Sequence, residues 1–355
     1  MVAEETPWGV ALTPPHAHGV PEAHARLRVL PEDFQVEEEL GFAPAGSGAH
    51  LLLRVRKINA NTQHVARQLA QLAGCRVAEV GYAGLKDRRA VAVQWFSVPR
   101  PRQPRDWDAV HSAEFSVLEH APHTRKLPRG ALAGNRFAIR VRSSDPAVSG
   151  ALLASQLAPR LALIERLGLP NYFGVQRFGR AGANLARIGT PLEELAPVER
   201  GFVLSAARAL IFNAVLAQRV RADSWGRLQS GDVVNLDGRG SVFALEHAPD
   251  EALQARCAAL EVHPTGPMWG SGTPLSGGAV AQLEAHVAAS LPHAAQLCTQ
   301  AGMRAERRSL RLAVRDLRTE TEPQALWLRF RLPRGAFATA LLRELVHAPE
   351  ELPEG

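Results

Sequence analysis

The sequence predicts an α+β protein of more than one domain, and three observations carry this prediction. The chain has 355 residues, more than a typical single domain. Residues 50–56, 94–98, 137–141 and 326–332 have the apolar pattern of β-strands. Segments with helical spacing separate the third strand from the fourth, so the last strand can return to the sheet formed by the first three.

The helices are predicted from apolar spacing and from residues that begin or end helices. After the first strand, Asn61 or Thr62 can cap a helix that Gly74 ends. A later helix is expected to begin at the cap residue Ser205, and Pro159 is expected to break or kink an earlier one. Including these two, the helices expected after Gly74 cover residues 151–167, 205–222, 278–290, 294–304 and 337–347.

A domain boundary is predicted at Gly168-Leu169-Pro170, where a helical segment ends. The middle region, residues 168–312, is then an insertion. Residues 1–167 and 313–355 are expected to form the first domain from two parts of the chain, because the strand at 326–332 can join the sheet of the N-terminal part.

The composition favours a polyanionic partner. The formal net charge is +6, the pI is about 9.9, and only three of the 41 Lys and Arg residues are lysines, namely Lys57, Lys86 and Lys126. Such a charge balance favours nucleic acid over a membrane. No apolar run approaches the length of about 20 residues that a membrane span needs. The first five residues lack the features of a signal peptide, so we expect a cytoplasmic protein.

The cysteines and histidines do not predict a metal site. Cys75, Cys257 and Cys298 are far apart and odd in number, which matches neither a disulfide framework nor zinc-ligand spacing. The chain also lacks a phosphate-binding loop, a dinucleotide fingerprint and a Gly-x-Ser-x-Gly motif. The sequence therefore predicts neither a metal nor a nucleotide cofactor.

The run Lys86-Asp87-Arg88-Arg89 is the strongest candidate for chemistry. It places one carboxylate among three cations, and neighbouring positive charge favours the ionised form of an acid. Asp87 is therefore a candidate nucleophile or anionic group, without the second acid that a hydrolase or two-metal enzyme requires. The same short pattern is also typical of a solvated surface turn.

The segment Asn171–Gly179 combines three aromatic residues with an arginine, a glutamine and two glycines. This combination suits contact with the backbone or bases of a nucleic acid. A packed turn at a domain hinge explains the same composition equally well, so both interpretations stay open.

Short blocks between residues 31 and 344 carry a resemblance to a known family. The blocks are Pro31–Glu38, Gly48–Thr62, Gly81–Val91, Arg125–Leu127, Gly130–Asn135, Asn171–Gly179, Leu204–Arg208, Leu332–Thr339 and Arg343–Glu344. In this order they resemble the TruD family of tRNA pseudouridine synthases, whose bacterial members modify uridine 13. The thirty residues before the first block match nothing in this pattern, which leaves the role of residues 1–20 open.

The resemblance implies a role for five residues. It makes Asp87 the catalytic aspartate and Lys86 its basic neighbour, and it places Phe34, Asn135 and Phe337 around the target uridine. It also implies a mixed-sheet pseudouridine synthase catalytic domain, interrupted by an inserted α+β TRUD domain over residues 168–312. The implied partner is tRNA, no cofactor is required, and a monomer is expected.

The function that follows is isomerisation of a uridine in tRNA to pseudouridine. Asp87 can attack C1′ of the ribose, attack C6 of the base, or abstract a proton from C2′, and the sequence leaves these routes open. The main alternative is a noncatalytic RNA-binding or tRNA-folding protein on the same scaffold. A metal-dependent nuclease is disfavoured, because it would need a cluster of acids.

Overall fold

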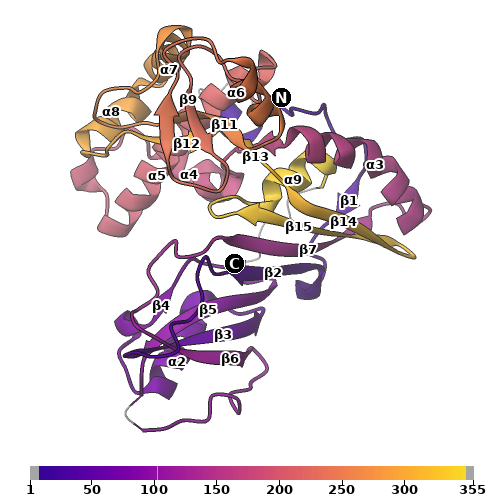
Figure 1. Cartoon of the computed structure of the whole chain (residues 1–355), viewed down its shortest axis with the longest axis vertical. Coiled ribbons are helices and arrows are strands. Elements are labelled where there is room, and N and C mark those ends of the chain that lie inside the picture. Colours follow the sequence, from indigo (N-terminus) through magenta and orange to yellow (C-terminus); the bar gives the residue numbers. More distant parts are fainter. Residues whose placement is uncertain (1–7, 102, 349–355) are drawn as a thin grey trace. The chain divides into compact units, whose positions relative to one another are not determined.

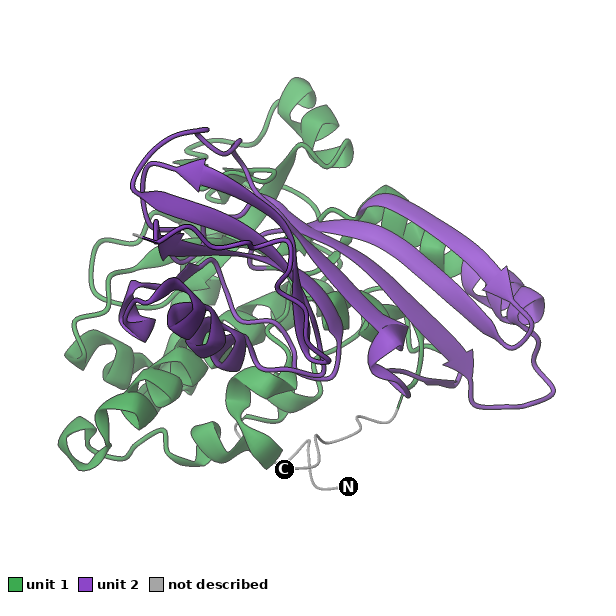
Figure 2. Ribbon diagram, turned by 90° about the horizontal axis from the view of Figure 1, so that it is seen from below, with its two compact units in different colours: residues 1–22, 159–314, 336–355 green, residues 23–158, 315–335 purple. Residues whose placement is uncertain are grey.

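The computed structural model describes residues 8–101 and 103–348, and the chain divides into two compact units. Unit 1 comprises residues 1–22, 159–314 and 336–355, and unit 2 comprises residues 23–158 and 315–335 (Figure 2). Both units contain helices as well as strands, so the predicted α+β class is confirmed.

Unit 2 is built on one nine-stranded mixed sheet with the order β14-β15-β7-β2-β5-β3-β6, in which β1 also pairs with β7 and β4 with β5. Strands β2 and β5 are parallel, and the other pairs are antiparallel. The strands are β1 (Ala25–Arg26), β2 (Phe34–Glu39), β3 (His50–Ile58), β4 (Gly81–Tyr82), β5 (Val91–Pro99), β6 (Phe115–His123), β7 (Gly134–Ser143), β14 (Arg315–Glu322) and β15 (Ala325–Pro333).

The return of the C-terminal strand to the first sheet is confirmed. β15 pairs with β7 over its whole length, from Ala325 opposite Arg142 to Pro333 opposite Gly134. In Figure 1 the yellow strands β14 and β15 lie beside the purple strand β7. Residues almost 200 positions apart in the chain are thereby joined in one sheet.

Both faces of strand β3 are covered by apolar side chains. Leu53 and Val55 pack with helix α2 (Thr62–Ala73), whereas Leu52 packs on the opposite side with Trp95 and Leu127. The helix ends at Gly74 with φ 65°, a left-handed conformation that favours glycine.

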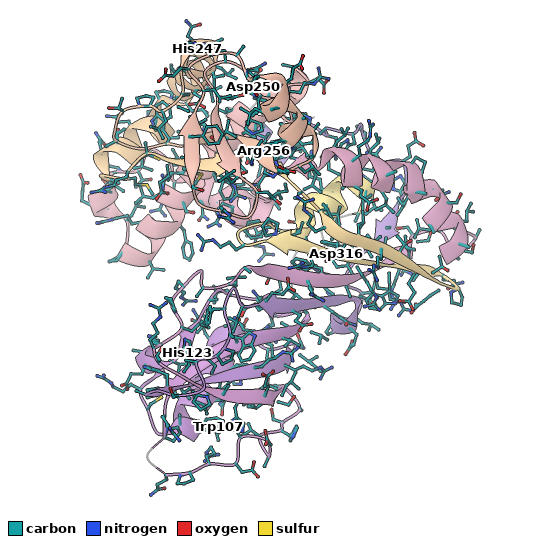
Figure 3. The ribbon with its side chains drawn as sticks, viewed as in Figure 1. Trp107, His123, His247, Asp250, Arg256 and Asp316 are labelled. Carbon is teal, nitrogen blue, oxygen red and sulfur yellow. The ribbon has the colours of Figure 1, made fainter. Side chains whose placement is uncertain are left out.

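The loop between β5 and β6 contributes to the core on the α2 side. Trp107, labelled in Figure 3, is only 3% exposed and packs into this cluster. Unit 2 also contains the short 3₁₀ helices η1 (Pro31–Asp33) and η2 (Val77–Glu79). Helix α3 (Gly150–Leu167) begins in unit 2 and ends in unit 1, with Pro159 inside it rather than at a break.

Six arginines on the strands of unit 2 form ion pairs with carboxylates from neighbouring strands and loops. The pairs are Arg54 with Glu37 and Glu119, Arg136 and Arg331 with Glu39, Arg140 with Asp33 and Glu322, Arg142 with Asp33, and Arg329 with Glu320. Each exposed pair stabilises the fold only weakly. These arginines therefore contribute to the sheet rather than to an unopposed basic surface.

Unit 1 contains a four-stranded sheet with the order β10-β9-β11-β12, a two-stranded sheet of β13 and β8, and most of the helices. The strands are β8 (Leu169–Pro170), β9 (Val233–Leu236), β10 (Val242–Ala244), β11 (Val262–Met268), β12 (Glu306–Ser309) and β13 (Arg311–Leu312). The helices are α1 (Gly9–Leu12), η3 (Val175–Phe178), η4 (Arg180–Gly182), α4 (Ala183–Ala186), η5 (Leu192–Glu194), α5 (Pro197–Arg221), α6 (Glu251–Ala258), α7 (Gly278–Ser290), α8 (Pro292–Gln300) and α9 (Ala338–Leu345).

Helix α5 forms the centre of unit 1, and its predicted start was wrong. The helix begins at Pro197, eight residues before Ser205, because proline is well suited to the first helical position. Ser205 instead lies inside the helix and accepts a hydrogen bond from Arg177 at 3.0 Å. By length and composition alone α5 is apolar enough to cross a membrane, but 67% of its most apolar window is buried in the protein.

The C-terminal helix belongs to a different unit from the one that the predicted division implies. Residues 315–335 join the sheet of unit 2, whereas α9 belongs to unit 1. Leu341 and Leu342 of α9 are buried, and the Glu344 carboxylate accepts backbone N–H bonds from Ala17 and His18 at 3.2 and 3.3 Å. The N-terminal segment, which matched nothing in the sequence pattern, therefore holds this helix in place.

Candidate active site around Asp87

The Asp87 side chain is 53% exposed and is held by one cation. It follows β4 in the loop that leads to β5, and its Oδ2 accepts a hydrogen bond from Nη2 of Arg28 at 2.9 Å. The sequence neighbours bind elsewhere: Lys86 pairs with Glu38, and Arg89 donates to the carbonyl of Val29. The cation that pairs with Asp87 thus comes from a residue 59 positions earlier in the chain.

Arg28 joins Asp87 to Phe34. The guanidinium of Arg28 lies 4.1 Å from the centroid of the Phe34 ring, a cation–π distance. The backbone of Arg28 has φ 54°, in the left-handed region that few arginines adopt. Sequence reasoning missed this residue, because it lies before the first family block and nothing in its neighbours distinguishes it from the other arginines.

The Phe34 ring is fixed by the sheet beneath it. Phe34 is 3% exposed and meets Phe137 edge to face at 6.1 Å, and Phe137 stacks on Phe330 at 5.2 Å. The three residues lie on the adjacent strands β2, β7 and β15, where cross-strand aromatic contacts stabilise a sheet. This row of rings gives Arg28 a rigid support.

A buried polar network holds the loop that carries Asp87. The ammonium of Lys86 lies 2.7 Å from Oε1 of Glu38, and the two side chains are 9% and 0% exposed. Oε2 of Glu38 accepts the backbone N–H of Trp95 at 3.0 Å. Gln94 extends the network, since its amide donates to the carbonyl of Gly84 at 2.7 Å. Lys86 therefore anchors the loop to β2 and β5 and leaves Asp87 exposed.

Lys57 fixes the backbone of Asp87 from the interior. Its fully buried ammonium donates to the Asp87 carbonyl at 2.7 Å and to the Ala60 carbonyl at 2.8 Å. Burial lowers the pKa of Lys57 to about 8, the Asp87 carboxylate opposes this shift, and the charge of Lys86 adds to it. The chain thus keeps a cation at a position where its charged form is costly.

The lowered pKa predicts a pH-dependent stability. Between pH 8 and pH 10.5 the unfolded chain keeps a proton on Lys57 that the folded chain has lost. The stability of the wild type should therefore rise with pH across this window relative to Lys57→Met, which cannot titrate. Urea unfolding of both proteins between pH 7 and 10.5 measures this difference. A difference that is constant or falls with pH would contradict the prediction.

Asn135 lies on the strand next to Glu38. It is the residue of β7 directly opposite Glu38 of β2, and it is 7% exposed. Its buried Oδ1 has no hydrogen-bond partner among the residues that the structure describes. A buried acceptor without a partner is costly in a finished core, so this atom is suited to receive a hydrogen bond from a ligand.

Of the five residues predicted for the site, four lie in unit 2, namely Asp87, Lys86, Phe34 and Asn135. Asp87 reaches Phe34 through Arg28, and Lys86 reaches the strand position opposite Asn135 through Glu38. Phe337 lies in unit 1, directly before α9, where it is partly buried against the core of that unit.

The Asn171–Gly179 segment is a packed turn in unit 1. Tyr172, Phe173 and Phe178 are at most 6% exposed and belong to the core around α5. The guanidinium of Arg308 lies 4.2 Å from the Phe173 ring centroid and donates to the Asn171 side chain at 2.5 Å. Of the two interpretations of this segment, the structure favours burial of the aromatic rings.

The described residues offer no metal-binding cluster. Within residues 8–101 and 103–348, no group of three or more His, Cys, Asp or Glu side chains is arranged to hold a metal ion. Cys75, Cys257 and Cys298 are free thiols.

The fold is that of a pseudouridine synthase of the D type. A solved structure from Methanosarcina mazei, described as a putative tRNA pseudouridine synthase D (TruD), aligns with a TM-score of 0.72 over 95% of this chain and 96% of that chain, at 20% identity. The family model "tRNA pseudouridine synthase D (TruD)" matches residues 15–197 and 190–345.

Curated relatives agree with this match. The protein named tRNA pseudouridine synthase D from Methylococcus capsulatus is 44% identical over 94% of both chains. The protein of the same name from Nitrosococcus oceani is 45% identical over 93% of this chain and 92% of its own. The chain therefore belongs to the tRNA pseudouridine synthase D (TruD) family.

Proposed function

We propose that this chain converts uridine 13 of tRNA to pseudouridine and that Asp87 starts the reaction. Membership of the family makes the chain an isomerase that acts on a uridine of tRNA. The observation that carries the role of Asp87 is its arrangement: an exposed carboxylate, held at 2.9 Å by a guanidinium that itself rests on an aromatic ring.

The reaction breaks the bond between N1 of uracil and C1′ of ribose and forms a bond between C5 and C1′. The proton on C5 leaves to solvent, N1 gains a proton, and no electron is exchanged with a cofactor. Asp87 attacks C1′ or C6, or removes the proton from C2′. Each route needs a carboxylate that the substrate can reach, and the Asp87 side chain is 53% exposed.

Asn135 and Phe34 are the proposed contacts to the base within unit 2. The unpartnered Oδ1 of Asn135 can accept an N–H of uracil. The Arg28 guanidinium covers the Phe34 ring, so contact between the uridine and that ring requires the guanidinium to move. Phe337, from unit 1, is proposed as a third contact, and Lys86 as a positioning residue that acts through Glu38.

We also propose where the protein works, its oligomeric state and its need for a cofactor. We place it in the cytoplasm as a monomer that works without a cofactor. Its net charge of +6 supports binding to the polyanionic tRNA.

The test is tritium release from a tRNA transcript labelled at C5 of its uridines. The full chain should release about one equivalent of tritium per tRNA, and a transcript with cytidine at position 13 should release none. A noncatalytic RNA-binding protein would bind the tRNA without releasing tritium, and carbodiimide mapping would then find no pseudouridine. Release that persists from the cytidine 13 transcript would refute the assignment of the position.

A further inference from the structure

A cavity lies in unit 2, outside the contacts that surround Asp87. Its volume is about 660 Å³, within the usual range for small-ligand sites. Helix α2, η2, β4 and the segment 126–129 line it. Its cationic and aromatic lining residues are Arg67, Lys126, Arg129 and Tyr82.

The charged residues that line this cavity, Arg67, Lys126 and Arg129, are all cationic. No carboxylate is among its lining residues in the described part of the chain. The acid closest in sequence to this wall, Glu79, is engaged with Arg76, which donates to it from its backbone N–H and its Nε at 3.0 Å. The Lys126 ammonium donates to the Ala78 carbonyl at 2.6 Å, which holds it at the wall and leaves two of its three N–H donors.

The aromatic wall of the cavity is a stack of two planar groups. The guanidinium of Arg129 lies 3.7 Å from the centroid of the Tyr82 ring, which contacts Phe96 of the core at 5.9 Å. Arg129 is exposed, so its guanidinium offers a planar cationic surface with a rigid ring behind it. Nucleic-acid bases stack on such guanidinium planes and on aromatic rings.

The cavity lies close to Asp87 along the chain. Tyr82 forms part of its wall, and five residues of chain can place the two Cα atoms no more than about 18 Å apart. Gly81 fixes the backbone there, because a Cβ on it would lie 2.5 Å from the Leu127 carbonyl oxygen and from Oγ of Ser97. A nucleic-acid strand that presents a uridine to Asp87 therefore passes within a few nucleotides of this cavity.

We propose that the cavity is a subsite for one unstacked nucleotide of the RNA substrate other than the target uridine. Its base stacks on the Arg129 guanidinium above Tyr82, and its phosphate binds Lys126 and Arg67. This inference rests on the proposed function in that it takes RNA as the substrate. It adds a second anchoring point, which would fix the strand while the target base is turned.

The experiment compares Arg129→Ala with Arg76→Ala. Both variants remove one arginine charge from neighbouring surfaces, but Arg76 is 84% exposed and does not line the cavity. The dissociation constant of the tRNA should rise by roughly 5- to 150-fold in Arg129→Ala, the loss expected for one base stack, and less than about threefold in Arg76→Ala. The rate of tritium release at saturating tRNA should be unchanged in Arg76→Ala, which does not line the cavity.

Two further measurements keep the result specific. Arg129→Lys, which keeps the charge but not the plane, should lose most of the affinity that Arg129→Ala loses. A tRNA that lacks one base at the stacked position should bind the wild type more weakly than intact tRNA does. Arg129→Ala should bind this tRNA and intact tRNA with the same affinity, because the stacking contact is already lost. Thermal unfolding should show that the variants remain folded, since Arg129 is exposed.

Equal effects of Arg129→Ala and Arg76→Ala would overturn the subsite, because the contribution of Arg129 would then be only general charge. A lowered rate at saturating tRNA with unchanged affinity would overturn it as well. These outcomes are separable from failure of the proposed function. A wild type that releases no tritium would refute the isomerase activity, while the binding comparison would still decide the subsite.

Discussion

Replacing Asp87 by asparagine is expected to lower the rate of tritium release from tRNA by roughly 1,000-fold, within the range that a positioned acid–base group contributes. Asparagine keeps the shape of the side chain and an oxygen that Arg28 can bind, but it is neither a nucleophile nor a base. Because the Asp87 side chain is 53% exposed, the free energy of unfolding should change by less than about 0.5 kcal/mol. Single-turnover tritium release and urea unfolding measure the two effects.

Two variants serve as controls for this prediction. Asp316→Asn changes an equally exposed carboxylate of unit 2, labelled in Figure 3, that pairs with Arg331, and it should leave the rate unchanged. Arg28→Met keeps the carboxylate and removes its cation, so the rate should fall by only about 10- to 100-fold, the value of one charge-assisted hydrogen bond. Wild-type activity in Asp87→Asn would exclude Asp87 as the reacting group.

Replacing Glu38 by alanine is expected to produce the largest loss of stability, about 3–5 kcal/mol. The substitution leaves the Lys86 ammonium as a buried cation without its carboxylate, and it also removes the acceptor of the Trp95 N–H. Breaking a buried pair on one side costs more than removing both partners. Urea unfolding followed by circular dichroism measures this loss.

Glu37, the residue before Glu38, provides the matched control for Glu38→Ala. Glu37 lies on the same strand and pairs with Arg54, but it is 43% exposed, so Glu37→Ala should cost no more than about 1 kcal/mol. The double variant Glu38→Leu with Lys86→Met should recover part of the stability that Glu38→Ala loses, since neither charge then remains buried. Equal losses in Glu37→Ala and Glu38→Ala would contradict the buried network.

Elements with a clear apolar period could be predicted from the sequence, and the central strand β2 could not. Its inward positions are Phe34, Val36 and Glu38, of which the last is a carboxylate. A pattern search expects charge at the surface, so a buried glutamate hides the alternation of the strand. Only the tertiary contact with Lys86 makes that position compatible with burial. The edge strand β14 was missed for a different reason, since most of its residues are exposed.

The sequence predicted the candidate residue Asp87 but not the contacts that hold it, because those contacts depend on the folded structure. The residue Asp87 was found because its local run of charges is unusual. Its actual partner, Arg28, could not be found, because ion pairs depend on folded distances and not on sequence adjacency. Lys86 illustrates the same limit, since the cation next to Asp87 in the chain binds Glu38 instead.

The scarcity of lysine has a consequence for chemical labelling. Lys57 is fully buried and Lys86 is held in an ion pair, so among the lysine side chains only that of Lys126 is exposed. Reagents that acylate amines will therefore modify little besides Lys126 and the chain's own α-amino group. Since Lys126 lines the cavity beside Tyr82 and Arg129, an acyl fluorophore on Lys126 becomes a local reporter of that cavity, without any cysteine having to be introduced.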